Sequence, residues 1–296
     1  MPVEFDPRFL HNDMSDDVNR DMLMEGPSEQ RDVPLTNLKT FAAGIIQRDI
    51  LVDDIIAIFA HCPNIEHLYL PDISERRDVE KIARITVDAC PRLSILYLNF
   101  DFEDGIGSIA LLNNILELMP AQQASKIKFS DTTEPLDPHT MRRLFQRHSS
   151  TLRYLDLSRC PTIPSKVLQV VFQECFALEE LRTYSSPDSG LCYITLEDAV
   201  SVDWVCLRLR CIEIEIGIEL SPTFLSKDKA YFRRQPPIVL SEEETRLFGL
   251  LEQLYRRLGA LMDLEEVDLR ATDLGRDRDS TLEIYGIFIS RHVEPW

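Results

Sequence analysis

A short apolar pattern recurs along this chain at a nearly constant interval. Its two clearest copies follow Cys62-Pro63 and Cys90-Pro91, where an apolar residue, two variable residues, a leucine, one variable residue and a second leucine come in that order. The interval between successive copies is 26 to 31 residues, except for a last interval of 55 residues. The central position of the pattern is held by Leu38, Leu68, Leu96, Ile127, Leu155, Leu181, Ile212 and Val267.

Each copy of the pattern predicts a strand, and each connection predicts a helix. Alternating apolar residues have the period of two that a strand with one buried face requires. The connections carry apolar residues three and four positions apart, as in the segments after Asp137-Pro138 and after Pro164, which is typical of a helix. A strand-helix unit of this length, repeated about eight times, predicts an α/β leucine-rich-repeat solenoid. We expect a parallel sheet on its concave face and helices on its convex face.

Polar residues at defined positions predict where several helices begin and end. Asp137 is a candidate N-cap with proline at the first helical position, and Thr195 and Ser241 begin capping-box sequences with Asp198 and Glu244. Gly259 is a good end signal for the helix that follows Ser241.

The pattern divides the chain into three parts. Residues 1–34 are predicted to be an acidic lead-in or cap, and residues 35–275 are predicted to be the solenoid. Residues 276–296 are predicted to be a C-terminal cap and tail, with a closing strand over 282–289. The 55-residue interval has two interpretations: one unit has lost its pattern, or a segment near 219–240 has been inserted.

The stretch from Leu152 to Cys175 carries the most specific version of the repeat, with Cys160 and Ile163 after the strand pattern. It resembles the cysteine-containing leucine-rich repeats of the substrate-recognition region of F-box proteins, and residues 254–269 look like an element of fungal F-box-like families. The resemblance covers roughly residues 35–275. It implies a substrate receptor in ubiquitin-dependent turnover. We find no F-box ahead of the repeats, so a Skp1-like ubiquitin ligase adaptor is an expected partner only if an F-box exists outside this chain.

Composition narrows the class of partner. The 296 residues carry a net charge of −18, which disfavours nucleic acid and anionic membrane surfaces and favours a basic protein. The same charge is also explained by solubility alone. We expect no signal peptide and no membrane span, and the odd number of seven cysteines indicates reduced thiols in the cytoplasm or nucleus.

Chemistry-bearing motifs are missing from the sequence. We find no nucleophile elbow, no P-loop and no H-E-x-x-H, so we expect no enzyme, no cofactor and no catalytic residues. No C-x-x-C pair is present either, and we expect no metal site. Four cysteines recur three residues before the first apolar position of a unit, where a small buried thiol packs well. These are Cys62, Cys90, Cys175 and Cys206.

Residues between the register leucines are expected to face the open side of the sheet and to bind a protein partner. The candidates are aromatic, basic and acidic: Tyr69, Tyr97, Tyr154, Tyr184, Arg182, Glu213, Glu215, Glu266 and Asp268. Further candidates are Arg233 and Arg234 in the 219–240 segment. Two alternatives remain open. The chain is a recognition scaffold of F-box-like type, or it is a stand-alone acidic inhibitor or regulator that covers a basic protein. The tyrosines and acids are also compatible with strand propensity and solvation alone.

Overall fold

The computed structural model describes residues 34–42, 52–70, 79–98, 106–129, 136–158, 160, 163–183, 193–218 and 241–273. Contacts divide the chain into two units, Met1–Val33 and Pro34–Trp296, and every described residue belongs to the second unit. The expected closing strand at 282–289, the segment 219–240 and Tyr184 lie outside the described residues.

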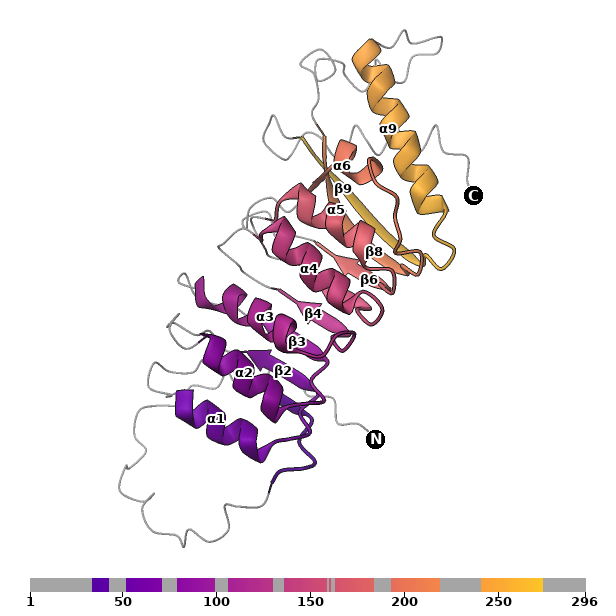
Figure 1. Ribbon diagram of the computed structural model, residues 1–296. Helices are drawn as coiled ribbons and strands as arrows, with labels where there is room; N and C mark the ends of the chain where they lie inside the picture. Colours follow the sequence, from indigo (N-terminus) through magenta and orange to yellow (C-terminus); the bar gives the residue numbers. More distant parts are fainter. Residues whose placement is uncertain are drawn as a thin grey trace, which may run out of the picture. The chain divides into compact units, whose positions relative to one another are not determined.

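Strands and helices alternate through the described residues, except that β7 follows β6 with no described helix between them (Figure 1). The strands are β1 (Thr40–Ala42), β2 (His67–Leu70), β3 (Ile95–Leu98), β4 (Lys126–Lys128), β5 (Tyr154–Asp156), β6 (Glu180–Arg182), β7 (Ile194–Thr195), β8 (Cys211–Ile218) and β9 (Glu266–Asp273). The helices are α1 (Val52–His61), α2 (Val79–Ala89), α3 (Ile106–Leu118), α4 (Pro138–His148), α5 (Ser165–Glu174), α6 (Leu196–Val200) and α9 (Glu242–Gly259).

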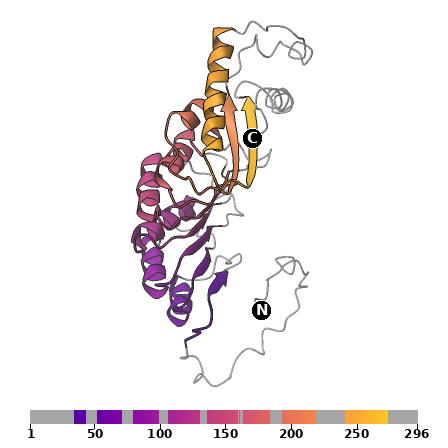
Figure 2. The ribbon, with the colours of Figure 1, turned by 90° about the vertical axis from the view of Figure 1, so that its right-hand side faces the viewer.

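The nine strands of the described residues form one parallel sheet, in the order β1-β2-β3-β4-β5-β6-β8-β7, with β9 paired to β8. The described helices lie along one face of this sheet, and none of them covers the other face (Figure 2). This arrangement confirms the predicted leucine-rich-repeat solenoid. Strand β7 was not predicted; it pairs with Ile216 and Gly217 of β8, beyond the residues of β8 that pair with β6.

The register of the sheet follows the central residues of the sequence pattern from the second unit onward. Leu68, Leu96, Ile127, Leu155, Leu181, Ile212 and Val267 are direct partners on successive strands. The first unit was placed wrongly: Phe41, not Leu38, pairs with Leu68. Phe41 packs partly buried against the core, and its ring meets Phe59 edge-on at 5.5 Å. The shift of three residues arises because Leu35, Leu38 and Phe41 form two overlapping apolar pairs with the same spacing, Leu35–Leu38 and Leu38–Phe41.

The long interval before the last unit connects two strands that are direct neighbours. Strand β8 pairs with β9 along eight residues, so no described strand lies between them, which favours an insertion over a unit that has lost its pattern. The connection contains segment 219–240 and the 18-residue helix α9, which is longer than the other described helices.

The central residues of the pattern form the core together with one stripe of each helix. Those from Leu68 to Ile212 are fully buried, and so are Met141, Leu144 and Phe145 of α4. Val267 is the exception: it holds the predicted register but is 47% exposed, so its predicted burial is wrong. The physical reason is that β9 is the last strand on its side of the described sheet, with no further described strand stacked beyond it.

The predicted helix starts at Asp137 and Thr195 are confirmed. The Asp137 carboxylate accepts from the Thr140 amide at 2.8 Å, and the Thr195 hydroxyl accepts from the Asp198 amide at 3.1 Å. Helix α9 ends at Gly259 as predicted. The capping interaction between Ser241 and Glu244 stays a prediction.

The repeated cysteines are buried thiols. Cys62, Cys90, Cys175 and Cys206 lie in the core at the ends of helical connections, as predicted, and Cys160 is also buried. Burial raises the pKa of Cys90 and of Cys206 to about 12, so both thiols stay protonated near neutral pH.

Candidate functional site

The open side of the sheet, called the inner face below, is built from the residues on either side of the register positions. Strand alternation turns these side chains away from the helices. They form two rows that cross the strands. The first row is Thr40, His67, Ile95, Lys126, Tyr154, Glu180, Cys211 and Glu266, and the second is Ala42, Tyr69, Tyr97, Lys128, Asp156, Arg182, Glu213 and Asp268. The register centred on Phe41 puts Thr40 and Ala42 in these rows, whereas a register centred on Leu38 predicts its neighbours Asn37 and Lys39 there.

An aromatic pair occupies the inner face at β2 and β3. The rings of Tyr69 and Tyr97 are stacked, with centroids 4.3 Å apart and planes inclined by 16°. Tyr69 is 37% exposed. Burial raises the pKa of Tyr97, and the neighbouring Tyr69 adds to this effect, so its hydroxyl stays protonated at neutral pH. A flat aromatic platform of this kind offers large contact area with little side-chain entropy to lose.

A basic group lies next to this pair, on β4. The Lys128 ammonium is 3.1 Å from the Asp156 carboxylate, which also accepts from the Tyr154 hydroxyl at 3.3 Å and from the Ser158 amide at 2.9 Å. These contacts hold Asp156 buried in spite of its charge. The Lys126 ammonium lies 5.1 Å from the centre of the Tyr154 ring. Burial is the main cause that raises the pKa of Tyr154, and Asp156 adds to it.

Lys126 is exposed and differs from Lys128 in its partners. No carboxylate of the described residues forms an ion pair with it, and the Tyr154 ring holds its position by a cation–π contact. Sequence reasoning placed Lys126, Lys128 and Asp156 on this face but left them out of the candidate binding set. Their contacts join neighbouring strands. The register pattern aligns Lys126 with Tyr154 and Lys128 with Asp156, and this alignment was the signal that predicts the contacts.

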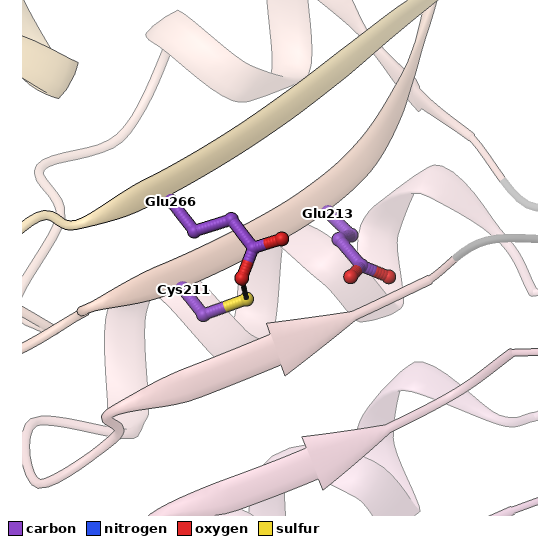
Figure 3. Close-up of side chains that lie close together, drawn as sticks. All are labelled: Cys211, Glu213 and Glu266. Atoms are coloured by element: carbon purple, nitrogen blue, oxygen red, sulfur yellow. Dashed lines mark hydrogen bonds between the residues drawn. The ribbon is translucent and has the colours of Figure 1, made fainter.

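Acidic residues gather at the other end of the inner face, on β6, β8 and β9. The Arg182 guanidinium lies 3.5 Å from Glu213 and 3.6 Å from Glu180, so two carboxylates share one cation. The Cys211 thiol donates to Glu266 with Sγ and Oε2 3.6 Å apart (Figure 3). The pKa of Cys211 rises to about 11, chiefly through burial; Arg182 opposes the rise and Glu266 adds to it.

Cys211, Glu213 and Glu266 bring three potential ligand atoms within 4.8 Å of one another (Figure 3). A thiolate with two carboxylates is a donor set that zinc accepts. Two observations disfavour a cation here. Arg182 already pairs with Glu213, and the protonated thiol of Cys211 already donates to Glu266. We therefore treat the three residues as part of the polar inner face.

The structure brings most of the predicted binding residues together and corrects one. Tyr69, Tyr97, Tyr154, Arg182, Glu213, Glu266 and Asp268 lie in the two rows. Glu215 was expected to be open to solvent but is only 7% exposed. The reason is that Ile214 to Ile218 of β8 are buried on both sides of the strand, in the region flanked by β7 and β9. Tyr184, Arg233 and Arg234 lie outside the described residues.

A second set of exposed apolar residues lies in the turns that precede three neighbouring strands. Each residue lies five positions before the register residue of its strand, and we call the set the turn-edge row. Its members are Phe176 before β6, Leu207 before β8 and Met262 before β9. Met262 is 94% exposed. The turn-edge row shares no residue with the inner face. A substitution in it therefore serves as a control for substitutions on the inner face.

Comparisons with known proteins give a structural similarity but no match to a protein family. No protein-family model matches this chain, and no curated protein sequence is significantly similar to it. Among solved structures, the chain is similar to the leucine-rich repeat-containing protein LegL7 from Legionella pneumophila, with 13% identity and a TM-score of 0.34. The match covers 83% of this chain and 78% of LegL7. Among the described helices, none is long and apolar enough to cross a membrane.

Proposed function

We propose that this protein is a non-enzymatic recognition scaffold that binds a protein partner on its inner face. The observation that carries the proposal is the stacked Tyr69–Tyr97 pair on β2 and β3, together with exposed Lys126 on the next strand, β4, where its ammonium lies over the Tyr154 ring. Aromatic and cationic groups held in place by neighbours are typical anchors of protein interfaces. A solenoid sheet supplies the extended surface on which such anchors act together.

The resemblance of residues 152–175 to F-box-type repeats supports a more specific role for the scaffold. It favours a substrate receptor in ubiquitin-dependent turnover, acting in the cytoplasm or nucleus. The acidic end of the inner face favours the alternative, a stand-alone regulator of a basic protein, because Glu180 and Glu213 share one arginine and Glu266 has none in the described structure.

Affinity purification with matched variants tests the proposal. Tagged wild-type protein, Tyr97→Ala and Leu207→Ser are compared by quantitative mass spectrometry, after thermal melts show that all three are folded. Tyr97→Ala removes half of the aromatic pair, whereas Leu207→Ser changes the exposed turn-edge row. We expect Tyr97→Ala to lose a partner that Leu207→Ser retains. Retention by Tyr97→Ala with loss by Leu207→Ser would move the binding surface to the turn edge and refute the proposal.

The same purification separates the two specific roles. Co-recovery of a Skp1-like adaptor supports the substrate receptor. Recovery of a basic protein without ligase components, and its loss in Glu266→Gln, supports the acidic regulator.

A further inference from the structure

The charges on the inner face are segregated along it, and this segregation specifies the chemistry of a bound segment. We propose that the partner of the inner face is an extended peptide segment with one acidic residue that pairs with Lys126 and one basic residue, about five or six positions away, that pairs with Glu266. The inference rests on the proposed function and deepens it.

Lys126 supplies the positive charge that would bind the acidic residue of the peptide. Its ammonium is exposed and is held over Tyr154, while the adjacent Lys128 is already paired with Asp156. In the described structure Lys126 therefore carries a positive charge that no carboxylate neutralises. A cation fixed by an aromatic ring has less side-chain freedom to lose when an anionic group binds.

The end of the inner face on β6, β8 and β9 has more carboxylates than cations. Arg182 is the common partner of Glu180 and Glu213, and Glu266 receives a hydrogen bond from the neutral thiol of Cys211. Among the described residues, no cation pairs with Glu266, and its side chain is exposed. A lysine or arginine of a partner would supply the missing charge and would form charge-assisted hydrogen bonds.

The spacing follows from the sheet register. Lys126 and Glu266 lie in the same row, joined through Tyr154, Glu180 and Cys211 on the strands between them. Four steps of about 4.8 Å between neighbouring strands give about 19 Å. An extended chain rises about 3.3 Å per residue, so about six residues span this distance. The expected spacing between the two charged residues is therefore five or six positions.

The aromatic pair lies on the side of Lys126 that faces away from Glu266, and it predicts a third residue of the peptide. Tyr97 lies on β3, one strand from Lys126, and Tyr69 lies one strand further. An apolar or aromatic residue about two positions beyond the acidic residue of the peptide would therefore lie on the stacked rings. The order apolar, acidic, basic is thus expected along the segment, and the distances are satisfied in either chain direction.

Selection from a library of random dodecapeptides displayed on phage tests this inference on the full-length protein. On the wild type, we expect enriched peptides to carry Asp or Glu and Lys or Arg five or six positions apart, with an apolar residue outside the acidic one. Lys126→Glu should replace the acidic preference by a basic one at that position. Arg208→Glu makes a similar charge reversal at an exposed turn residue and should leave the preference unchanged.

Binding of one enriched synthetic peptide, followed by fluorescence anisotropy, gives the second measurement. Lys126→Glu should weaken binding by about tenfold, and a peptide whose acidic residue is changed to lysine should recover most of that loss on the variant. Enriched peptides without the charge pair, absence of enrichment, or equal effects of Lys126→Glu and Arg208→Glu would overturn the inference. The proposed function is decided separately, by whether Tyr97→Ala loses the cellular partner that Leu207→Ser retains.

Discussion

The imidazole of His148 donates from Nε2 to the main-chain oxygen of Leu116 at 3.0 Å, and its Nδ1 accepts from the amide of Ala124 at 3.3 Å. Both contacts require the neutral imidazole in one tautomer. The side chain is buried at the end of α4 and connects it to the preceding unit. A histidine on the apolar stripe of a helix thus satisfies one main-chain group of the preceding repeat, at Leu116, and one at the start of its own strand-helix unit, at Ala124.

This histidine predicts a pH dependence of stability. Burial lowers the pKa of His148 from its ordinary value of 6.5, against the opposing effect of the Leu116 oxygen. The unfolded chain therefore binds a proton near pH 6.5 that the folded chain does not bind, and stability is lost as the pH falls below 6.5. Urea unfolding between pH 7.5 and 5 measures the slope.

Two variants test whether His148 causes the pH dependence of stability. His148→Gln should flatten it, whereas His139→Gln, at an exposed position of the same helix, should preserve it. An unchanged slope in His148→Gln would show that other groups cause the pH dependence.

Register partners at the end of the sheet should differ in their contribution to stability. Ile212 and Val267 are direct partners, but Ile212 is fully buried and Val267 is half exposed. We expect Ile212→Ala to lower the free energy of unfolding by about 2–5 kcal/mol and Val267→Ala to lower it by less than about 1 kcal/mol. Chemical denaturation measures both. Equal losses would mean that Val267 is covered in solution.

The reactivity of Cys211 should report the charges around it. With the pKa of this thiol raised to about 11, only about 0.1% is thiolate at pH 8, so alkylation should be slow. Removing the negative charge in Glu266→Gln should lower the pKa and speed alkylation, and Arg182→Gln should slow it. Peptide mass spectrometry follows Cys211, with the buried Cys206 as internal reference. The opposite order of rates would contradict the arrangement in Figure 3.

Two neighbouring acidic residues on α6 should contribute unequally to the stability of the fold. Asp198 accepts from the Ser165 hydroxyl and the Lys166 ammonium, both at 2.6 Å, and connects α5 with α6. Glu197 makes one exposed ion pair with Arg246 at 3.4 Å. We expect Asp198→Ala to destabilise the protein by about 1–3 kcal/mol and Glu197→Ala by less than about 0.5 kcal/mol. Thermal and urea unfolding compare them, and a larger effect of Glu197→Ala would refute the assignment.

Much of the fold was predictable because its repeat is local. The positions of Leu68, Leu96, Leu155 and Leu181 specify which side of each strand is buried, and the structure confirms them as neighbours. The N-caps at Asp137 and Thr195 were predictable for the same reason, since each depends on residues three positions apart.

The errors lie where local patterns are ambiguous or where the array ends. Leu38 was chosen as the register residue in place of Phe41 because the first unit contains two overlapping apolar pairs with the same spacing. The burial of Val267 was misjudged because strand alternation contains no information about what stacks beyond the last strand. Glu215 fits the alternation of an open face but lies where β8 is buried on both sides.

By itself the sequence determined the repeat length, the inward position of the register leucines and the residues available to the inner face, because these follow from periods of two and of three to four along the chain. Only the tertiary structure decided that Lys128 pairs with Asp156 while Lys126 stays without a described carboxylate partner, and that Arg182 is shared by Glu180 and Glu213. Those relationships depend on distances between side chains of different units, which arise when the strands stack and select each residue's neighbours.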